Sequence, residues 1–357
     1  MSLRALFWFR PVSILSLIRM MPIMFDTVVL PSPAAMTERQ LPSSMDLVAE
    51  IDHLRREMNA VILAHYYQDG EIQDLADFVG DSLDLSRRAA ATEAEVIVFC
   101  GVRFMGEVAK ILSPERLVLI PDAQAGCSLE ESCRADVFRH FRNKHPEHLA
   151  VTYINCSAEV KALSDVIVTS SNAEAIIRAL PADRPILFAP DRHLGAYLQH
   201  KTGREMTLWP GSCIIHEQFS ARELIKLKVR HPRAAVIAHP ECPEAVLQVA
   251  DHIGSTRALL DYVTQSPAEE FIVATERNII HQMTKKAPHK QFIPAPGADG
   301  SCNCSSCPFM ALNSLEKLYL AMVNRAPRIE IDEPLRQAAL VPLQRMLEMS
   351  SKVVPVR

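Results

Sequence analysis

Residues 61–65 read VILAH, four apolar residues followed by a histidine. A run this short and this apolar predicts a strand that is buried on both faces, as the strands of parallel sheets are. The same pattern returns at 149–153 as LAVTY and at 234–239 as AAVIAH. Three buried strands that each end in a polar side chain indicate an internal repeat, and this repeat decides the fold.

Further features recur at matching places in each repeat. A hydroxyl residue lies 17 positions beyond each strand end, at Ser82, Ser170 and Thr256. Two more apolar runs follow in each repeat, and the last one leads into a cysteine, at Cys127, Cys213 and Cys307. Equal offsets in three places favour three copies of one structural unit.

The alternation of apolar runs with amphipathic stretches predicts the α/β class. Right-handed crossovers would make each repeat a short parallel sheet covered by helices on both faces. We therefore expect three pseudo-threefold-related, three-layer α/β/α domains, and the alternative is one large doubly wound sheet. The expected limits are an N-terminal extension at 1–42, repeats at 43–145, 146–232 and 233–325, and a C-terminal helical segment at 326–357.

The composition excludes several classes of protein. A net charge of −4 gives no electrostatic reason to expect nucleic acid or an anionic membrane as a partner. A hydrophobic share of 48% with 22% charged residues excludes a chain that is disordered throughout. Nine cysteines, an odd number spread over 357 residues, favour metal or catalytic chemistry in a reducing, cytoplasmic compartment over a disulfide framework.

The first 35 residues are kept apart from the fold. An Arg-Pro pair divides their apolar stretch, so they contain no run of the roughly 18 apolar residues that a spanning helix needs. We expect a disordered extension or a misassigned start, with translation beginning at Met36 or Met45. Beyond them, Ser43 or Ser44 is expected to cap a helix with apolar residues at 47, 51, 54 and 58.

The cysteines of the three repeats predict a metal centre. Parallel sheets bind ligands beyond the carboxyl ends of their strands, and a threefold arrangement would direct those ends at one central cavity. Three thiolates, from Cys127, Cys213 and Cys307, suit a [4Fe–4S] cluster with one iron left open as a Lewis acid. Zinc is the competing metal, because three cysteines and an open position would also suit it.

The other cysteines are expected to play lesser parts. Cys100 and Cys156 lie in or beside strand runs and are predicted to be buried apolar residues. Cys302 and Cys304 are expected to be a redox-sensitive pair or exposed loop thiols. Cys133 receives no role from the sequence.

The repeated hydroxyls point to anion binding. Ser82, Ser170 and Thr256 are each expected at a helix N-terminus, where free N–H groups and the helix dipole favour phosphate or carboxylate. The stretch 171–174, SNAE, reads as a capping box, which would place Ser170 at the mouth of its helix. Three such helix starts suit substrates with several negative charges, whereas each one taken alone is more simply a cap.

Proton transfer has its own candidates at the strand ends. Glu241 beside a cationic cluster would stay ionised and is the expected general base. His65 and His239 occupy matching strand ends and could also move protons. Tyr67 and Tyr153 could donate hydrogen bonds to a developing oxyanion.

Longer stretches carry a family resemblance. They are AHYYQDGEIQDLADFVGDSLDLSR (64–87), VFCGVRFMGEVAKIL (98–112), YINCSAEVKALSDVIVTSSNA (153–173), PDRHLGAYL (190–198), GSCIIHEQF (211–219), AHPECP (238–243), IGSTRALL (253–260), ATE (274–276) and CPFMALN (307–313). From about residue 46 to 350 the chain closely resembles the quinolinate synthase family of bacterial NAD biosynthesis.

That resemblance implies three α/β/α domains around a central [4Fe–4S] cluster and a transferase activity. The implied reaction condenses iminoaspartate with dihydroxyacetone phosphate to quinolinate, phosphate and two waters, with L-aspartate oxidase as the supplier of iminoaspartate. The implied cluster ligands are Cys127, Cys213 and Cys307, and the implied catalytic residues are Glu241, His65, Tyr67 and His239. The implied substrate contacts are His65, Ser82, Tyr153, Ile154, Asn155, Ser170, His216, His239, Pro240, Glu241 and Thr256.

The chain departs from the family at one place, and two other function classes stay open. Some members carry C-x-x-C-x-x-C, but Ser301 stands at the first position here and Cys302 is shifted by one, which weakens any thiol switch there. The open alternatives are another three-cysteine hydro-lyase and an iron–sulfur sensor. A sensor would be expected to keep four thiolates.

Overall fold

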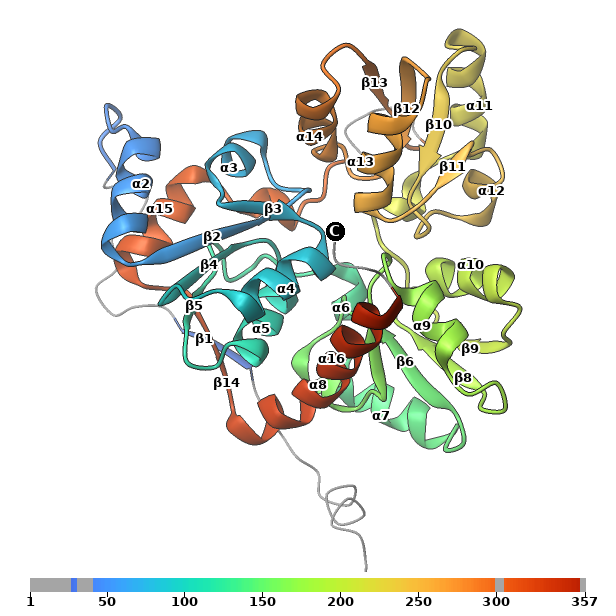
Figure 1. The fold of residues 1–357 in the computed structure, drawn as a ribbon, viewed down its shortest axis with the longest axis horizontal. Helices are drawn as coiled ribbons and strands as arrows, with labels where there is room; N and C mark the ends of the chain where they lie inside the picture. Colours follow the sequence, from blue (N-terminus) through green and yellow to red (C-terminus); the bar gives the residue numbers. More distant parts are fainter. Residues whose placement is uncertain (1–26, 31–40, 299–304, 354–357) are drawn as a thin grey trace, which may run out of the picture.

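The computed structural model describes residues 27–30, 41–298 and 305–353. Within these ranges the strands form three separate sheets, which lie around a common centre (Figure 1). The predicted α/β class with several short parallel sheets is therefore confirmed, and the alternative of one large doubly wound sheet is wrong. The part of the chain placed in the structure contains no helix long and apolar enough to cross a membrane.

The first sheet contains the VILAH run at residues 61–65. Its parallel strands lie in the order β3-β2-β4-β5. They are β2 (Ala60–His65), β3 (Phe78–Gly80), β4 (Val96–Cys100) and β5 (Leu117–Leu119). The helices of this part are α2 (Leu47–Glu57), α3 (Gly70–Leu75), α4 (Ser82–Ala91) and α5 (Arg103–Leu112).

The second sheet repeats the same order, β7-β6-β8-β9, again with parallel pairs. Its strands are β6 (Leu149–Tyr153), β7 (Val166–Val168), β8 (Ile186–Ala189) and β9 (Met206–Leu208). The helices that accompany it are α6 (Ser128–Ser132), α7 (Ala135–Asn143), α8 (Ala158–Ala162), α9 (Ala173–Ala179) and α10 (Arg192–Thr202).

The third sheet has the order β11-β10-β12-β13, so one topology occurs three times. Its strands are β10 (Ala235–Ala238), β11 (His252–Ile253), β12 (Glu270–Ala274) and β13 (Gln291–Pro294). Its helical segments are η2 (His216–Gln218), α11 (Ala221–Arg230), α12 (Glu244–Leu247), α13 (Thr256–Gln265), α14 (Ile279–Lys286) and η4 (Met310–Leu312).

The two ends of the chain extend the first sheet. After α15 (Leu315–Asn324), strand β14 (Arg328–Ile331) pairs antiparallel with β5, and β1 (Thr27–Leu30) pairs antiparallel with β14. The stretch expected to be an unstructured extension thus contains a strand, and the C-terminal segment contains a strand as well as helix α16 (Glu333–Val353). Short edge strands carry little sequence signal, which is why neither was expected.

Helix α16 joins the first two repeats. It packs on α5 of the first repeat and on β7, α8 and α9 of the second. Its residues Leu335, Ala339, Leu343 and Met346 are fully buried, at helical spacing, in a core that both repeats share. Burial of each large side chain contributes about 1.5–3 kcal/mol, so this helix fixes the two repeats against each other.

One helix start differs from the expected one. Helix α2 begins at Leu47, and its cap is Asp46, whose carboxylate accepts a hydrogen bond of 3.1 Å from the Ala49 N–H. The expectation that Ser43 or Ser44 caps this helix is wrong. Asp46, directly before the first apolar position, accepts from the N–H three residues further on and so starts the helix later than either serine would.

Candidate functional site

The carboxyl ends of the three sheets border one cavity. Most of the site residues expected from the sequence line it: His65, Tyr67, Ser82, Cys127, Tyr153, Asn155, Ser170, Cys213, His216, His239, Glu241, Thr256 and Cys307. Ile154 and Pro240 are buried next to this lining and do not form part of it. The repeat therefore brings together side chains that lie up to 242 positions apart in the chain.

Each of the three cavity cysteines sits at the start of a turn with the same local geometry. The sulfur of Cys127, of Cys213 and of Cys307 accepts hydrogen bonds from the backbone N–H groups two and three residues further on. Those N–H groups belong to residues 129 and 130, 215 and 216, and 309 and 310. Backbone donors favour the thiolate over the thiol, and the thiolate is the form that binds metal.

The surroundings of the three sulfurs make them costly to ionise without a cation. Burial raises the pKa of Cys127 and of Cys213 far above the usual range, and burial raises the pKa of Cys307 to about 11. Cys127 also repels both Cys307 and Cys213 electrostatically. Three buried cysteines in one cavity, each with two N–H donors and with Cys127 repelling the other two when they are thiolates, fit a group that binds three thiolates and supplies positive charge.

Hydrogen bonds hold the cysteine turns in place. Ser128, next to Cys127, accepts a bond of 3.2 Å from the N–H of Ile214, next to Cys213. The N–H of Cys307 donates over 3.3 Å to the Glu276 carboxyl group. The turns are thus tied to one another or to a neighbouring strand end before any metal binds.

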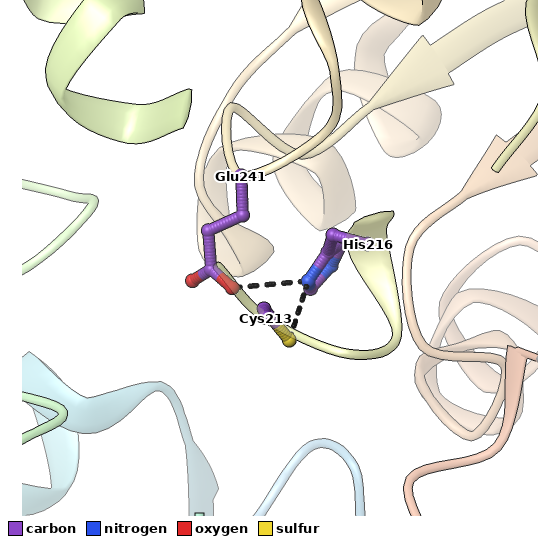
Figure 2. A group of neighbouring side chains, drawn as sticks. All are labelled: Cys213, His216 and Glu241. Atoms are coloured by element: carbon purple, nitrogen blue, oxygen red, sulfur yellow. Dashed lines mark hydrogen bonds and ion pairs between the residues drawn. The ribbon is translucent and has the colours of Figure 1, made fainter. Parts of the chain in front are cut away.

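Cys213 also belongs to a second group of potential ligands, with His216 and Glu241 (Figure 2). The Nδ1 atom of His216 lies 3.3 Å from the Cys213 sulfur and 3.0 Å from Oε2 of Glu241. Sulfur, nitrogen and oxygen form a donor set that zinc accepts, so the geometry leaves zinc as the competing metal.

Glu241 is held as an anion by its neighbours. Burial opposes its ionisation, but attraction to His216 and hydrogen bonds from His216 and, over 2.6 Å, from the Tyr153 hydroxyl outweigh burial and lower its pKa. The carboxylate is 3% exposed, which places an ionised base inside the cavity wall. This state agrees with the role expected of Glu241.

Two of the cavity histidines and both of its tyrosines stay uncharged. Burial lowers the pKa of both His65 and His239 to about 3, so each imidazole is neutral near pH 7. Burial, together with the Glu241 charge, raises the pKa of Tyr67 and Tyr153 well above the usual range. The neutral imidazoles can accept or donate protons, and the phenols can only donate.

Two of the three repeated hydroxyls occupy the expected place. Ser82 and Thr256 are the first residues of α4 and α13. The caps of these helices are the preceding residues, Asp81 and Ser255, so the cavity hydroxyls are not used up in capping. Ser170 lies two residues before Asn172, the cap position of α9.

The capping box predicted at residues 171–174 is wrong. Helix α9 has Asn172 at its cap and no capping hydrogen bond from a side chain. The Ser171 hydroxyl instead bonds to the Asp81 carboxylate over 2.5 Å and to the Ser255 hydroxyl over 3.0 Å. A contact between repeats therefore replaces the local cap, and it joins the three helix starts at one point.

Several functional candidates were missed by the sequence argument. Thr275 and Glu276 follow directly after β12, at a strand end that the repeat already marked as a ligand position. Glu276 lines the cavity, and burial raises its pKa to about 8. Asp81 also lines the cavity. The strand-end rule could have found the first two, whereas Asp81 looked like a simple cap.

The remaining cysteines divide as the sequence indicated. Cys100 and Cys156 are fully buried in apolar clusters, as expected. Cys133 packs in the same cluster as Cys156. Cys302 and Cys304 lie outside the described residues.

Comparisons with known proteins place the chain in a family. The family described as "Quinolinate synthetase A protein" matches residues 49–348. A protein named quinolinate synthase from Thermosynechococcus vestitus is 59% identical over 327 residues, which cover 92% of this chain and 100% of that protein. Namesakes from Trichormus variabilis and Prochlorococcus marinus are 61% and 58% identical, covering 86% and 89% of this chain and 94% and 96% of their own lengths. The chain therefore belongs to the quinolinate synthetase A protein family.

Proposed function

We propose that this chain is a transferase that makes quinolinate from iminoaspartate and dihydroxyacetone phosphate. The atoms balance without an oxidant or a reductant, because the two substrates yield quinolinate, one phosphate and two waters. The observation that carries the proposal is the single cavity in which three cysteines, the hydroxyls of Ser82, Ser170 and Thr256, and an ionised glutamate meet. Membership of the family supports it.

Cys127, Cys213 and Cys307 would hold a [4Fe–4S] cluster. The matching N–H donors on all three sulfurs fit that group. When bound, such a cluster with three protein ligands supplies a Lewis acid at its fourth iron. We place the reaction in the cytoplasm, because a reducing compartment keeps the cysteines available for iron.

The helix starts supply the binding sites for the substrate anions. Both substrates are negatively charged, one as a dicarboxylate and one as a phosphate ester. Ser82 and Thr256 stand at the first turns of ten-residue helices, where N–H groups and the helix dipole favour anions. Ser170 adds a third hydroxyl to the cavity wall. Asn155, Ile154, Pro240 and His216 complete the proposed substrate contacts.

Proton transfer would centre on Glu241. Its ionised carboxylate can take a proton from the substrate, and Tyr153 stabilises the charge until then. Neutral His65 and His239 can relay protons, each accepting a proton at one ring nitrogen as the other releases its proton to a departing hydroxyl group. The Tyr67 hydroxyl lies close enough to the hydroxyl of Thr256, at 3.1 Å, to donate a hydrogen bond near the bound phosphate.

An assay with both substrates tests the proposal. Protein purified without oxygen, with its iron and sulfide measured, should form quinolinate only when iminoaspartate and dihydroxyacetone phosphate are both present. Iminoaspartate would be generated in the assay by L-aspartate oxidase, the proposed supplier. Dehydration of a small hydroxy acid without quinolinate would instead identify a different hydro-lyase, and a loaded cluster with no turnover of either kind would favour a sensor.

A further inference from the structure

The three hydroxyls proposed to hold substrate anions each have a chain neighbour that the proposed reaction does not use. These neighbours are Asp81 before Ser82, Ser171 after Ser170, and Ser255 before Thr256. The structure brings the neighbours into contact, because the Ser171 hydroxyl oxygen lies 2.5 Å from Oδ2 of Asp81 and 3.0 Å from the Ser255 hydroxyl oxygen. One residue from each repeat therefore meets the other two, one position along the chain from a cavity hydroxyl.

The hydrogen bonds of this contact form one complete chain. A hydroxyl has a single hydrogen, so Ser171 donates to the Asp81 carboxyl group and accepts from Ser255. The other oxygen of Asp81 accepts from two N–H groups in the first turn of α4, over 3.0 and 2.9 Å. The Ser255 oxygen accepts from the Ala258 N–H in the first turn of α13, over 3.2 Å. Ser171 thus ties the starts of both helices to the second repeat.

The loop that carries Ser171 is itself anchored to helix α16. The amide oxygen of Asn172 accepts from the Thr169 N–H over 2.6 Å, and its amide nitrogen donates to the Ser350 hydroxyl over 2.8 Å. Asn172 is 1% exposed, and Ser350 is fully buried near the end of α16. The loop is therefore held from behind, so that Ser171 can in turn hold its two partners.

We propose that Ser171 is a positioning residue that fixes the spacing of the three cavity hydroxyls. Ser171 and Ser255 do not line the cavity, so the Ser171 hydroxyl acts without touching a substrate. The catalytic consequence rests on the proposed function, in which two anions must be held at the separation that the reaction requires. A misplacement of about 1 Å in such an arrangement can lower a rate about a hundredfold.

The ion pair between Arg257 and Asp84 does not replace this contact. It joins α13 to α4 over 3.2 Å with both side chains partly exposed, and exposed pairs contribute little to stability. It also leaves out the second repeat. Loss of the Ser171 hydroxyl should therefore free the hydroxyl of the second repeat from the other two and loosen the caps of α4 and α13.

Hydrogen exchange measured by mass spectrometry tests the contact in the full chain. Ser171→Ala removes the hydroxyl, so the N–H groups that bond to Asp81 and Ser255 should exchange about two- to tenfold faster, as should residues 169–173. Ser171→Thr keeps the hydroxyl and should exchange like the wild type. Ser157→Ala is the matched control, because Ser157 caps α8 of the same repeat and does not line the cavity. It should speed exchange in α8 alone.

Kinetics of the protein purified without oxygen give the second readout. Ser171→Ala should lower kcat for quinolinate formation about ten- to a hundredfold with a much smaller change in KM, because every cavity hydroxyl is still present. Ser171→Thr should recover most of the rate.

Three results would overturn the inference. They are faster exchange confined to residues 169–173 in Ser171→Ala, an unchanged kcat in that variant, and a threonine variant that behaves like the alanine variant in both measurements. Failure of the wild type to make quinolinate would instead overturn the proposed function, and the exchange result would still decide whether Ser171 holds the two helix starts.

Discussion

The Tyr153 hydroxyl donates a 2.6 Å hydrogen bond to Oε1 of Glu241, across the boundary between the second and third sheets. The bond joins the end of β6 to the turn after β10. It stabilises a buried carboxylate that burial alone would favour as the neutral acid. The base of the proposed reaction is thus completed by another repeat.

Replacement of Glu241 by glutamine tests its role as the base. Glutamine keeps the shape and can still accept from Tyr153, but it cannot take a proton. The rate of quinolinate formation should fall about 10²- to 10⁴-fold while the iron content and the cluster spectrum stay normal. A loss of less than about tenfold would show that Glu241 only orients its neighbours, and the base would then be His239 or His65.

Replacement of the cavity cysteines tests the ligand assignment. Cys127→Ser, Cys213→Ser and Cys307→Ser should each abolish retention of the cluster, because each removes one of three thiolates. Cys100→Ala is the control, since Cys100 is fully buried in β4. Iron and sulfide per protein are measured after anaerobic purification. A Cys307→Ser protein that keeps four irons would contradict the assignment.

Removal of the helix-start hydroxyls tests anion binding. Ser82→Ala, Ser170→Ala and Thr256→Ala should raise KM for the substrates by about 10- to 150-fold, because a hydrogen bond to a charged group contributes about 1.5–3 kcal/mol. Ser220→Ala is the matched control, because Ser220 caps α11 and does not line the cavity. Iron content should be unchanged in all four variants. An unaltered KM in the three cavity variants would show that these hydroxyls do not bind the substrate anions.

Shortening the chain tests the part played by β1. A chain that begins at Met36 lacks β1, which pairs only with β14 at the outer edge of the first sheet. Activity and iron content should therefore match those of the full chain, because β14 and β5 lie between β1 and the strands nearer the cavity. Both chains are compared by iron analysis and by the quinolinate assay. A truncated chain without iron would show that the edge strand supports the site.

The sequence predicted what depends on short, regular patterns. The runs at β2 and β10 contain no polar residue before their ends, and the run at β6 contains only Thr152, so these patterns indicated burial on both faces. The equal offsets then predicted that the cysteines and hydroxyls line one cavity, because residues at matching positions of the three repeats face the same centre. The family resemblance supplied His216, which no pattern singled out.

What the sequence did not predict depends on contacts between distant segments. Ser171 looked like a local cap, but its hydroxyl is used by Asp81 and Ser255 of the other two repeats. Thr275 gains its partners, Tyr67 and His216, only when three segments fold together. A local pattern cannot show whether a serine caps its own helix or bonds to a residue about ninety positions away.

The antiparallel pairing of β14 with β5 constrains how the protein is made on the ribosome. Proteins fold from the N-terminus during synthesis, and the first four parallel strands leave the ribosome long before β14 does. The open edge of β5 therefore stays unpaired until almost the whole chain has been made. The third cavity cysteine, Cys307, is also made late. Closure of the sheet and completion of the three-cysteine cavity therefore belong to the last stage of synthesis and the time after it.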